Sequence, residues 1–314
     1  MKVVVSAGIN NQIVYPHDGF VNCFENFGNM FAKAGHDTMY LGLANLIDNT
    51  GLIQDCDLWI TEFNTKYIPL YLVTLNSKRK GKVWFVQHGS YDEFNRYDAW
   101  ALKAINMGDA YLANTLYSKR FIENIIDIAV HNDIVQPIPD KFFSYFSDIG
   151  IKNGRILIGH VGGREYPKED PRRYHLLATS LFKDYPMTLI TRNQEYNRKF
   201  GFCDDIEFVE PINDGDDYYS FFSKFSYYVS VSTIPTLGRD IIIAACSGVV
   251  SISSPYYYQE KLFPSLTAYN INDFFQFKNT LNSDNSFVLK NALSNAREFS
   301  MNSIYRICEE RLGW

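Results

Sequence analysis

The chain has 314 residues, which suits two domains of ordinary size better than a single core. Its 46% hydrophobic and 21% charged residues are typical of a globular protein, and a net charge of −5 excludes a broad positive field for nucleic acid. The five cysteines form no CxxC pair, which argues against a disulfide framework and a structural zinc site. No apolar run resembles a signal peptide or a membrane span, so we expect a cytoplasmic protein.

The first half of the chain alternates buried-strand patterns with helical ones. Five apolar runs predict strands, at residues 2–7, 37–43, 57–63, 82–88 and 109–115. Helical patterns lie between them, and the first of these covers residues 20–35 and ends at Gly35. Strands that alternate with helices predict a parallel sheet covered on both faces.

A second domain follows a segment that is typical of a connection. Residues 134–153 contain two prolines and end at a glycine. The alternation then restarts, with strands predicted at residues 155–161, 187–193, 205–211, 227–233 and 249–254. We therefore expect an α/β protein with two Rossmann-like domains, residues 1–150 and 151–314, whose parallel sheets face a central cleft. Ligands of such sheets bind beyond the carboxyl ends of the strands, so the loops after strands are the candidate sites.

Several common cofactor and catalytic motifs are missing from these loops. Neither domain opens with GxGxxG, and the chain has no P-loop, GxSxG or HExxH sequence. We therefore expect no dinucleotide cofactor and no P-loop nucleotide.

The first loop of the second domain carries two cations. In VGGREYPKED, residues 161–170, two glycines allow a sharp bend after the strand, and Arg164 and Lys168 follow them. A guanidinium and an ammonium that converge on one point suit a diphosphate, through forked hydrogen bonds and a point charge. A solvated polar turn is the alternative interpretation.

This order of strand, glycine, arginine, lysine and helix resembles the donor-phosphate motif of retaining GT-B glycosyltransferases, in particular glycosyltransferase family 4 and its relatives. The resemblance implies that Arg164 and Lys168 bind the diphosphate of a nucleotide sugar, with a UDP-sugar as the first candidate, and stabilise the departing phosphate. It also implies no metal, because cationic side chains take that role in this fold.

A second segment, residues 227–254, resembles the family's donor-binding strand and helix but lacks its acids. The family's spaced glycines and its alanine match Gly238, Gly248 and Ala244. Pro235 and Ile243 replace the two glutamates, of which the second normally holds the ribose, and Asp240 is a nearby acid that would take part of this role. The residues that would meet the phosphates are Thr236, Leu237, Gly238 and Arg239. A plain helix start capped by Thr236 is the alternative.

The first domain offers two candidate positions. Gly19 lies in the loop where the family's glycine-rich turn contacts the donor, and Asp18 or His17 beside it would touch substrate. His88 ends a strand at the position of the family's histidine near the sugar. An ordinary turn and a locally satisfied histidine are the alternatives. His36, which follows the first helix, is expected to be structural.

The strand at residues 205–211 matches the family strand whose following loop receives the nucleotide base. The resemblance implies that Val209, Glu210 and Pro211 flank the base. The acidic residues that follow, 213–217, are interpreted as a solvated helix start rather than as a metal site.

The function that these features predict is transfer of a sugar from a nucleotide diphosphate to a hydroxyl. The resemblance implies retention of configuration, an acceptor-binding domain at residues 1–150 and a nucleotide-sugar-binding domain at residues 151–314, with the last helix crossing back to the first domain. His88, Asp18, Arg164 and Lys168 are the candidate catalytic residues.

The acceptor stays open between two classes. We place a hydroxymethylated base of phage DNA first, because residues 18–36 resemble phage DNA glucosyltransferases of this fold, and a bacterial surface glycan second. Basic residues at 77–82 and at 172–173 would contact DNA phosphates, or else form solvated turns. The missing glutamates keep a third interpretation open, a catalytically degenerate nucleotide-sugar-binding or partner subunit. The oligomeric state has no signature in the sequence.

Overall fold

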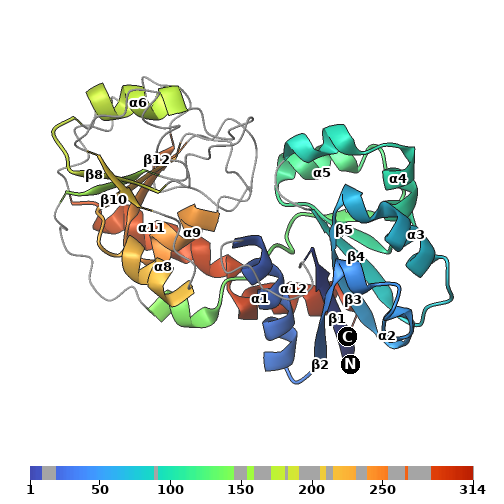
Figure 1. Ribbon diagram of the computed structural model, residues 1–314. Coiled ribbons are helices and arrows are strands. Elements are labelled where there is room, and N and C mark those ends of the chain that lie inside the picture. Colours follow the sequence, from blue (N-terminus) through green and yellow to red (C-terminus); the bar gives the residue numbers. More distant parts are fainter. Residues whose placement is uncertain are drawn as a thin grey trace. The chain divides into compact units, whose positions relative to one another are not determined.

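The chain folds into two compact units (Figure 1). Unit 1 is Met1–Asp140 together with Glu298–Trp314, and unit 2 is Lys141–Arg297. The computed structural model describes residues 1–8, 19–87, 91–144, 154–158, 171–180, 183–190, 206–209, 215–230, 239–253, 266–267 and 284–313, of which 19–23, 91–93, 144, 171–175, 215–218 and 266–267 are described by their backbone alone. No helix within these residues is long and apolar enough to cross a membrane.

Unit 1 contains a six-stranded parallel sheet with the order β2-β1-β3-β4-β5-β6. The strands are β1 (Lys2–Ala7), β2 (Asp37–Gly42), β3 (Leu58–Phe63), β4 (Lys82–Gln87), β5 (Ala110–Leu112) and β6 (Ala129–His131). Every residue of β3 is buried, because helices cover both faces of the sheet and its apolar run contacts protein on each side. The predicted α/β class is confirmed.

The helices of unit 1 follow the strands in the order expected of right-handed crossovers. They are α1 (Gly19–Lys33), α2 (Thr50–Asp55), α3 (Ile68–Leu75), α4 (Ala99–Asn106), α5 (Leu116–Ile122) and α12 (Met301–Leu312), with short 3₁₀ helices η1 (Leu43–Asn45), η2 (Thr65–Tyr67), η3 (Tyr91–Arg96) and η4 (Asp140–Ser144), the last of which runs across the boundary between the units. Helices α2 to α5 contribute to one hydrophobic cluster with the sheet, and α1 packs beside α12 (Figure 1).

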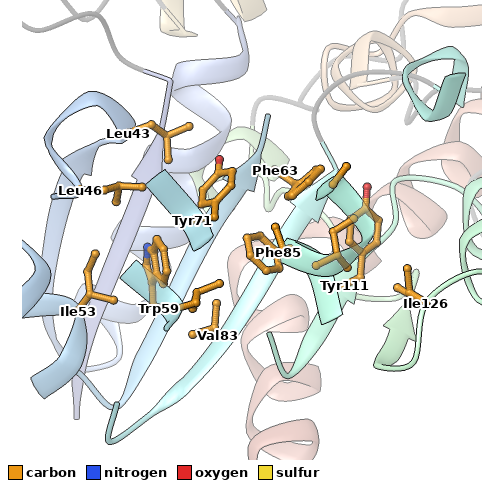
Figure 2. Packing of buried hydrophobic residues seen from close by; sticks show 14 of the residues in the cluster. Leu43, Leu46, Ile53, Trp59, Phe63, Tyr71, Val83, Phe85, Tyr111 and Ile126 are labelled. Atoms are coloured by element: carbon orange, nitrogen blue, oxygen red, sulfur yellow. The ribbon is translucent and has the colours of Figure 1, made fainter. Parts of the chain in front are cut away.

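Aromatic side chains fill much of the cluster under α2 to α5. Phe63 and Phe85, on neighbouring strands, meet edge to face with ring centroids 5.3 Å apart, and Tyr71 of α3 contacts both (Figure 2). Edge-to-face pairs of this kind are favourable beyond the apolar area that they bury. This packing holds β3 and β4 at a fixed position beneath α3, and both strands end beside candidate site residues.

The end of α1 follows from a glycine. Gly35 has φ +86° and donates its backbone N–H to Ala32, while His36 donates to Phe31. These are the two bonds of a Schellman motif, which needs the left-handed conformation that glycine adopts without strain. The predicted helix end at Gly35 is confirmed.

Helix α12 belongs to unit 1 although it ends the sequence. Ile138 and Met301 exchange backbone bonds just before it, and Arg311 forms an ion pair of 2.7 Å with Asp133 after β6. Tyr305 bonds to His36 at 2.8 Å beside α1. The last helix is therefore held against residues from the first half of the chain.

Unit 2 contains a second six-stranded parallel sheet, with the order β12-β11-β10-β7-β8-β9. The strands are β7 (Ile156–Ile158), β8 (Met187–Ile190), β9 (Glu207–Val209), β10 (Tyr227–Ser230), β11 (Val250–Ser253) and β12 (Leu266–Thr267). The described helices are α6 (Pro171–Ser180), α8 (Gly215–Phe222), α9 (Arg239–Cys246) and α11 (Ser286–Ala296), followed by η7 (Arg297–Phe299), whose residues from Glu298 on belong to unit 1. Aliphatic residues of β7, β10 and β11 form the centre of its core.

Candidate functional site

Each sheet has one topological switch point, where neighbouring strands send their connections in opposite directions. In unit 2 it lies between β7, which leads to β8 on one side, and β10, which leads to β11 on the other. In unit 1 it lies between β1, which leads to β2, and β3, which leads to β4. Open α/β sheets bind their ligands at the carboxyl ends of the strands at this point. The two positions are therefore the structural candidates for binding sites.

The predicted phosphate-binding segments follow the two strands at the switch point of unit 2. Strands β7 and β10 pair in parallel, with Ile158 beside Val229. Residues 161–170 come after β7 and residues 231–238 come after β10, so both segments leave the sheet from neighbouring strands at the same edge. The residues themselves lie outside the described part of the chain. That part excludes Asp18, His88, Arg164, Lys168, Glu210, Pro211, Thr236, Leu237 and Gly238.

Two predicted donor-binding residues, Arg239 and Asp240, open α9 directly after this edge. Asp240 lies in the first helical turn, where a carboxylate interacts favourably with the helix dipole. The hydroxyl of Tyr228, a buried residue of β10, donates to Asp240 Oδ2 at 3.1 Å. The start of α9 is therefore tied to the strand at the switch point.

Ile243, one turn further along α9, is part of the core. Only 2% of its surface is exposed, and all residues from Ile241 to Cys246 are buried. The position that holds a ribose-binding glutamate in the resembled family thus faces protein in this chain. A polar group there would need a partner inside the core.

The predicted base-binding residue Val209 lies elsewhere on the sheet. It ends β9, the edge strand, and pairs with Ile190 of β8. Three strand spacings separate β9 from β10, which amounts to roughly 14 Å at about 4.8 Å per strand. The structure therefore does not bring Val209 next to Asp240, although both lie at the carboxyl edge of one sheet.

In unit 1 the sequence missed a buried acid at the switch point. Glu62, near the end of β3, is 1% exposed. Its Oε2 accepts the backbone N–H of Gly8, just after β1, at 2.6 Å, and its Oε1 accepts Asn64 Nδ2 at 3.2 Å. The signal in the sequence is a glutamate within an otherwise apolar strand run, LWITEF. Buried carboxylates are rare unless they are bonded, so this one is a marker of the site.

A second buried polar pair fixes the end of β4, directly before the predicted His88. Gln87 is fully buried; its Oε1 accepts the backbone N–H of Asn114 at 2.9 Å, and Asn114 Nδ2 donates back to the Gln87 carbonyl at 3.3 Å. The carboxyl ends of β4 and β5 are thus joined side chain to backbone. Like Glu62, Gln87 was predicted only as part of a strand.

The basic residues at 77–82 lie at the opposite edge of the sheet. They precede β4, and Arg79 pairs with Asp109 at 2.8 Å while Lys80 pairs with Asp57 at 2.6 Å. Both acids precede strands as well, so the cluster forms local ion pairs at the amino edge. This favours the interpretation as a solvated turn over contact with DNA. The side chains of Arg172 and Arg173 are not among those described.

Two described histidines have lowered pKa values. Burial lowers the pKa of His36, whose Nε2 bonds to the hydroxyl of Tyr305. Burial also lowers the pKa of His131, which the nearby Asp133 carboxylate opposes. His36 precedes β2 at the amino edge and packs against Phe31 and Tyr305, in keeping with the expected structural role. No group of three His, Cys, Asp or Glu residues that would suit a metal ion occurs in the described ranges.

Comparison with known proteins gives a match in fold but not in sequence. No protein-family model matches the chain, and no curated protein sequence matches it significantly. Solved structures do match. An α-glucosyltransferase in complex with UDP and a DNA containing an HMU base superposes with a TM-score of 0.75 at 10% identity, covering 100% of this chain and 99% of that chain.

Two further structures extend the match. The apo structure of OtsA gives a TM-score of 0.71 at 11% identity and covers 100% of this chain and 99% of that one. TarM from S. aureus, in complex with UDP and glycan ligands, gives 0.63 at 14% identity over 86% of this chain and 58% of its own. The predicted architecture is confirmed: the chain has the GT-B fold, with two Rossmann-like parallel sheets.

Proposed function

We propose that the protein is a glycosyltransferase that moves a sugar from a UDP-sugar to a hydroxyl group. The single observation that carries the proposal is the adjacency of β7 and β10, because both predicted phosphate-binding segments leave the sheet from these neighbouring strands at its switch point. The fold supports it, since structures of the same fold were solved with UDP.

The proposed reaction is a substitution at the anomeric carbon. The bond from this carbon to the diphosphate breaks and its electron pair leaves with the diphosphate oxygen. The hydroxyl oxygen of the acceptor forms the new bond, and its proton passes to the departing phosphate or to water. Arg164 and Lys168 would stabilise the leaving diphosphate by preorganised positive charge. Retention of configuration is the outcome that the family resemblance implies.

The other predicted residues take binding roles in this proposal. The amides at Thr236, Leu237 and Gly238 would bind phosphate oxygens beside Arg239, and Asp240 would meet the ribose. Gly19 would approach the donor through its backbone, Asp18 and His88 would contact the reacting groups, and the base would lie by Val209, Glu210 and Pro211.

We propose a hydroxymethylated DNA base as the acceptor, ahead of a glycan. Support comes from the resemblance of residues 18–36 and from the DNA-bound glucosyltransferase with the same fold. The setting would be the cytoplasm, and the described cysteines Cys56, Cys246 and Cys308 are free thiols, as a reducing compartment leaves them.

The test is UDP binding and UDP-glucose turnover by the wild type and by Arg164→Ala and Lys168→Ala. Each substitution should weaken UDP binding and lower turnover, because a charge on the leaving diphosphate loses its partner. Arg155→Ala is the matched control: it removes a guanidinium just before β7, at the opposite edge of the same sheet, where Arg155 pairs with Glu207. Unchanged UDP affinity in Arg164→Ala would refute the phosphate assignment.

The acceptor is tested separately, with DNA that contains 5-hydroxymethylated bases against unmodified DNA and against glycan acceptors. Transfer to the modified DNA alone is expected, with a rate that falls as salt is raised. Transfer to a glycan alone would replace DNA by the second acceptor class.

The buried Ile243 favours a second candidate function, a subunit that binds a nucleotide sugar without turning it over. UDP binding that depends on Arg164, with no turnover for any donor or acceptor in the panel, would select this candidate.

A further inference from the structure

Glu62 lies at the switch point of unit 1 in an arrangement that aims its carboxylate at the end of β1. Strands β1 and β3 pair in parallel, with Ser6 beside Thr61, so the residues after them share the carboxyl edge. Glu62 reaches across this pair to the backbone N–H of Gly8 at 2.6 Å. A charge-assisted bond of this length is strong, and within the core it is strengthened further by the low dielectric.

The conformation of Glu62 is itself held by the core. Its backbone carbonyl accepts the hydroxyl of Tyr71 at 2.6 Å, and the same hydroxyl accepts the backbone N–H of Asn64 at 3.3 Å. Burial, and then the Glu62 carboxylate, raise the pKa of Tyr71 well above its usual value, so this hydroxyl stays protonated and donates. Tyr71 is packed between Trp59 and Phe63 (Figure 2), which leaves the Glu62 backbone little freedom.

Gly8 is matched to this carboxylate by its lack of a side chain. A Cβ at this position would lie 3.2 Å from Glu62 Oε2 and 3.6 Å from Oε1, closer than ordinary contacts. The carboxylate therefore occupies the space that any other residue would fill. Gly8 is the last described residue before the segment that leads to Asp18 and to the start of α1 at Gly19.

We propose that Glu62 is a positioning residue for the transfer reaction: its carboxylate fixes Gly8, and so the point and direction in which the chain leaves β1 toward Asp18 and Gly19. The inference rests on the proposed function, because those two residues are its candidate substrate contacts. Burying a carboxylate costs free energy that an apolar residue would not, and a role in the site accounts for its retention.

The first test compares Glu62→Ala with Glu62→Gln. The alanine variant should lose about 100-fold in kcat, the cost of misplacing a reacting group by roughly 1 Å, while UDP affinity, which depends on Arg164 in unit 2, stays unchanged. The glutamine variant should regain most of the rate, because its amide oxygen still accepts the Gly8 N–H. Glu123→Ala, an exposed carboxylate of the same unit, is the matched control and should behave as wild type.

A second variant approaches the same contact from the other side. Gly8→Ala should also lower kcat, because its methyl group displaces the carboxylate. In the double variant with Glu62→Ala the two losses should not add, since the space and the bond have both already been removed. Additive losses would overturn the coupling that we infer.

A readout independent of turnover guards against a variant that is simply less stable. Hydrogen exchange at the Gly8 amide should accelerate in Glu62→Ala and remain slow in Glu62→Gln, relative to exchange within β4. Unchanged exchange at Gly8 in the alanine variant would overturn the inference whatever the turnover.

The outcomes separate this inference from the proposed function. Wild-type turnover that is lost in Arg164→Ala but kept in Glu62→Ala overturns the positioning role alone. Equal losses in Glu62→Gln and Glu62→Ala, with one limb of the pH profile gone, would make Glu62 a proton-transfer group instead. A wild type that neither binds UDP nor turns over UDP-glucose overturns the proposed function, and the Gly8 exchange still reports whether the contact exists.

Discussion

Ile243 is the residue at which chemistry and packing compete most directly. It stands where the resembled family has a ribose-binding glutamate, yet 2% of its surface is exposed and it lies within a helix turn that is buried throughout. A core position of this kind selects against charge, so the ribose contact in the proposed reaction has to come from a neighbour such as Asp240. The sequence revealed the substitution, but only the burial of α9 explains why it is tolerated.

Replacing Ile243 by glutamate should therefore destabilise unit 2 rather than restore a donor contact. An unpaired carboxylate at this position should cost roughly 3 kcal/mol or more of unfolding free energy. Ile243→Val, as control, should cost only about 0.5–1.5 kcal/mol, the usual effect of one lost methylene. Denaturant unfolding measures both, and calorimetry measures UDP affinity. An Ile243→Glu protein of normal stability that binds UDP more tightly would show that the position faces the donor.

Among the elements, the long apolar strands could be predicted and the short ones could not. The runs at β1, β3 and β4 are each six residues long and were predicted within one residue at either end. Strands β6 and β12 have three and two residues, too few for a pattern to emerge, and they are held by pairing with β5 and β11. Glu62 and Gln87 were missed for a related reason, because the register between strands decides what a strand end contacts.

The contact between α1 and α12 predicts a dependence of stability on pH. Burial lowers the folded-state pKa of His36, so the unfolded chain binds a proton there at a higher pH, near the ordinary value of about 6.5. The free energy of unfolding is therefore full above this pH and falls as the pH drops toward the folded-state pKa. His131 contributes in the same direction.

His36→Gln should reduce this dependence while keeping a side chain that can bond to Tyr305. Thermal unfolding of both proteins between pH 7.5 and about 5 tests it. The wild type should lose more stability over this range than the variant, and His131→Gln should remove part of the remaining slope. Parallel curves for wild type and His36→Gln would contradict the assignment.

At the scale of the whole molecule, the strand orders carry the functional argument. Each sheet reverses its winding once, between β1 and β3 and between β7 and β10, and each reversal leaves two loops at one edge. The candidate residues quoted from motifs were scattered along the sequence, and strand order is what assigns Arg164, Lys168 and the start of α9 to one switch point. Strand order follows from handed crossovers and from which faces are apolar, and a single sequence does not reveal the direction in which each crossover runs.

If the switch point of unit 2 binds the nucleotide, UDP should protect unit 2 and leave unit 1 nearly unchanged. At a UDP concentration 100 times its Kd, binding adds about 2.7 kcal/mol to the stability of the state that binds it. Hydrogen exchange should therefore slow most in β7, β10 and the start of α9, the elements nearest the proposed phosphate contacts. Arg164→Ala should abolish this slowing at the same UDP concentration, whereas Arg155→Ala should keep it. Protection that appears first around β1 and β3, and that survives Arg164→Ala, would instead move the nucleotide to the switch point of unit 1 and make Glu62 part of its site.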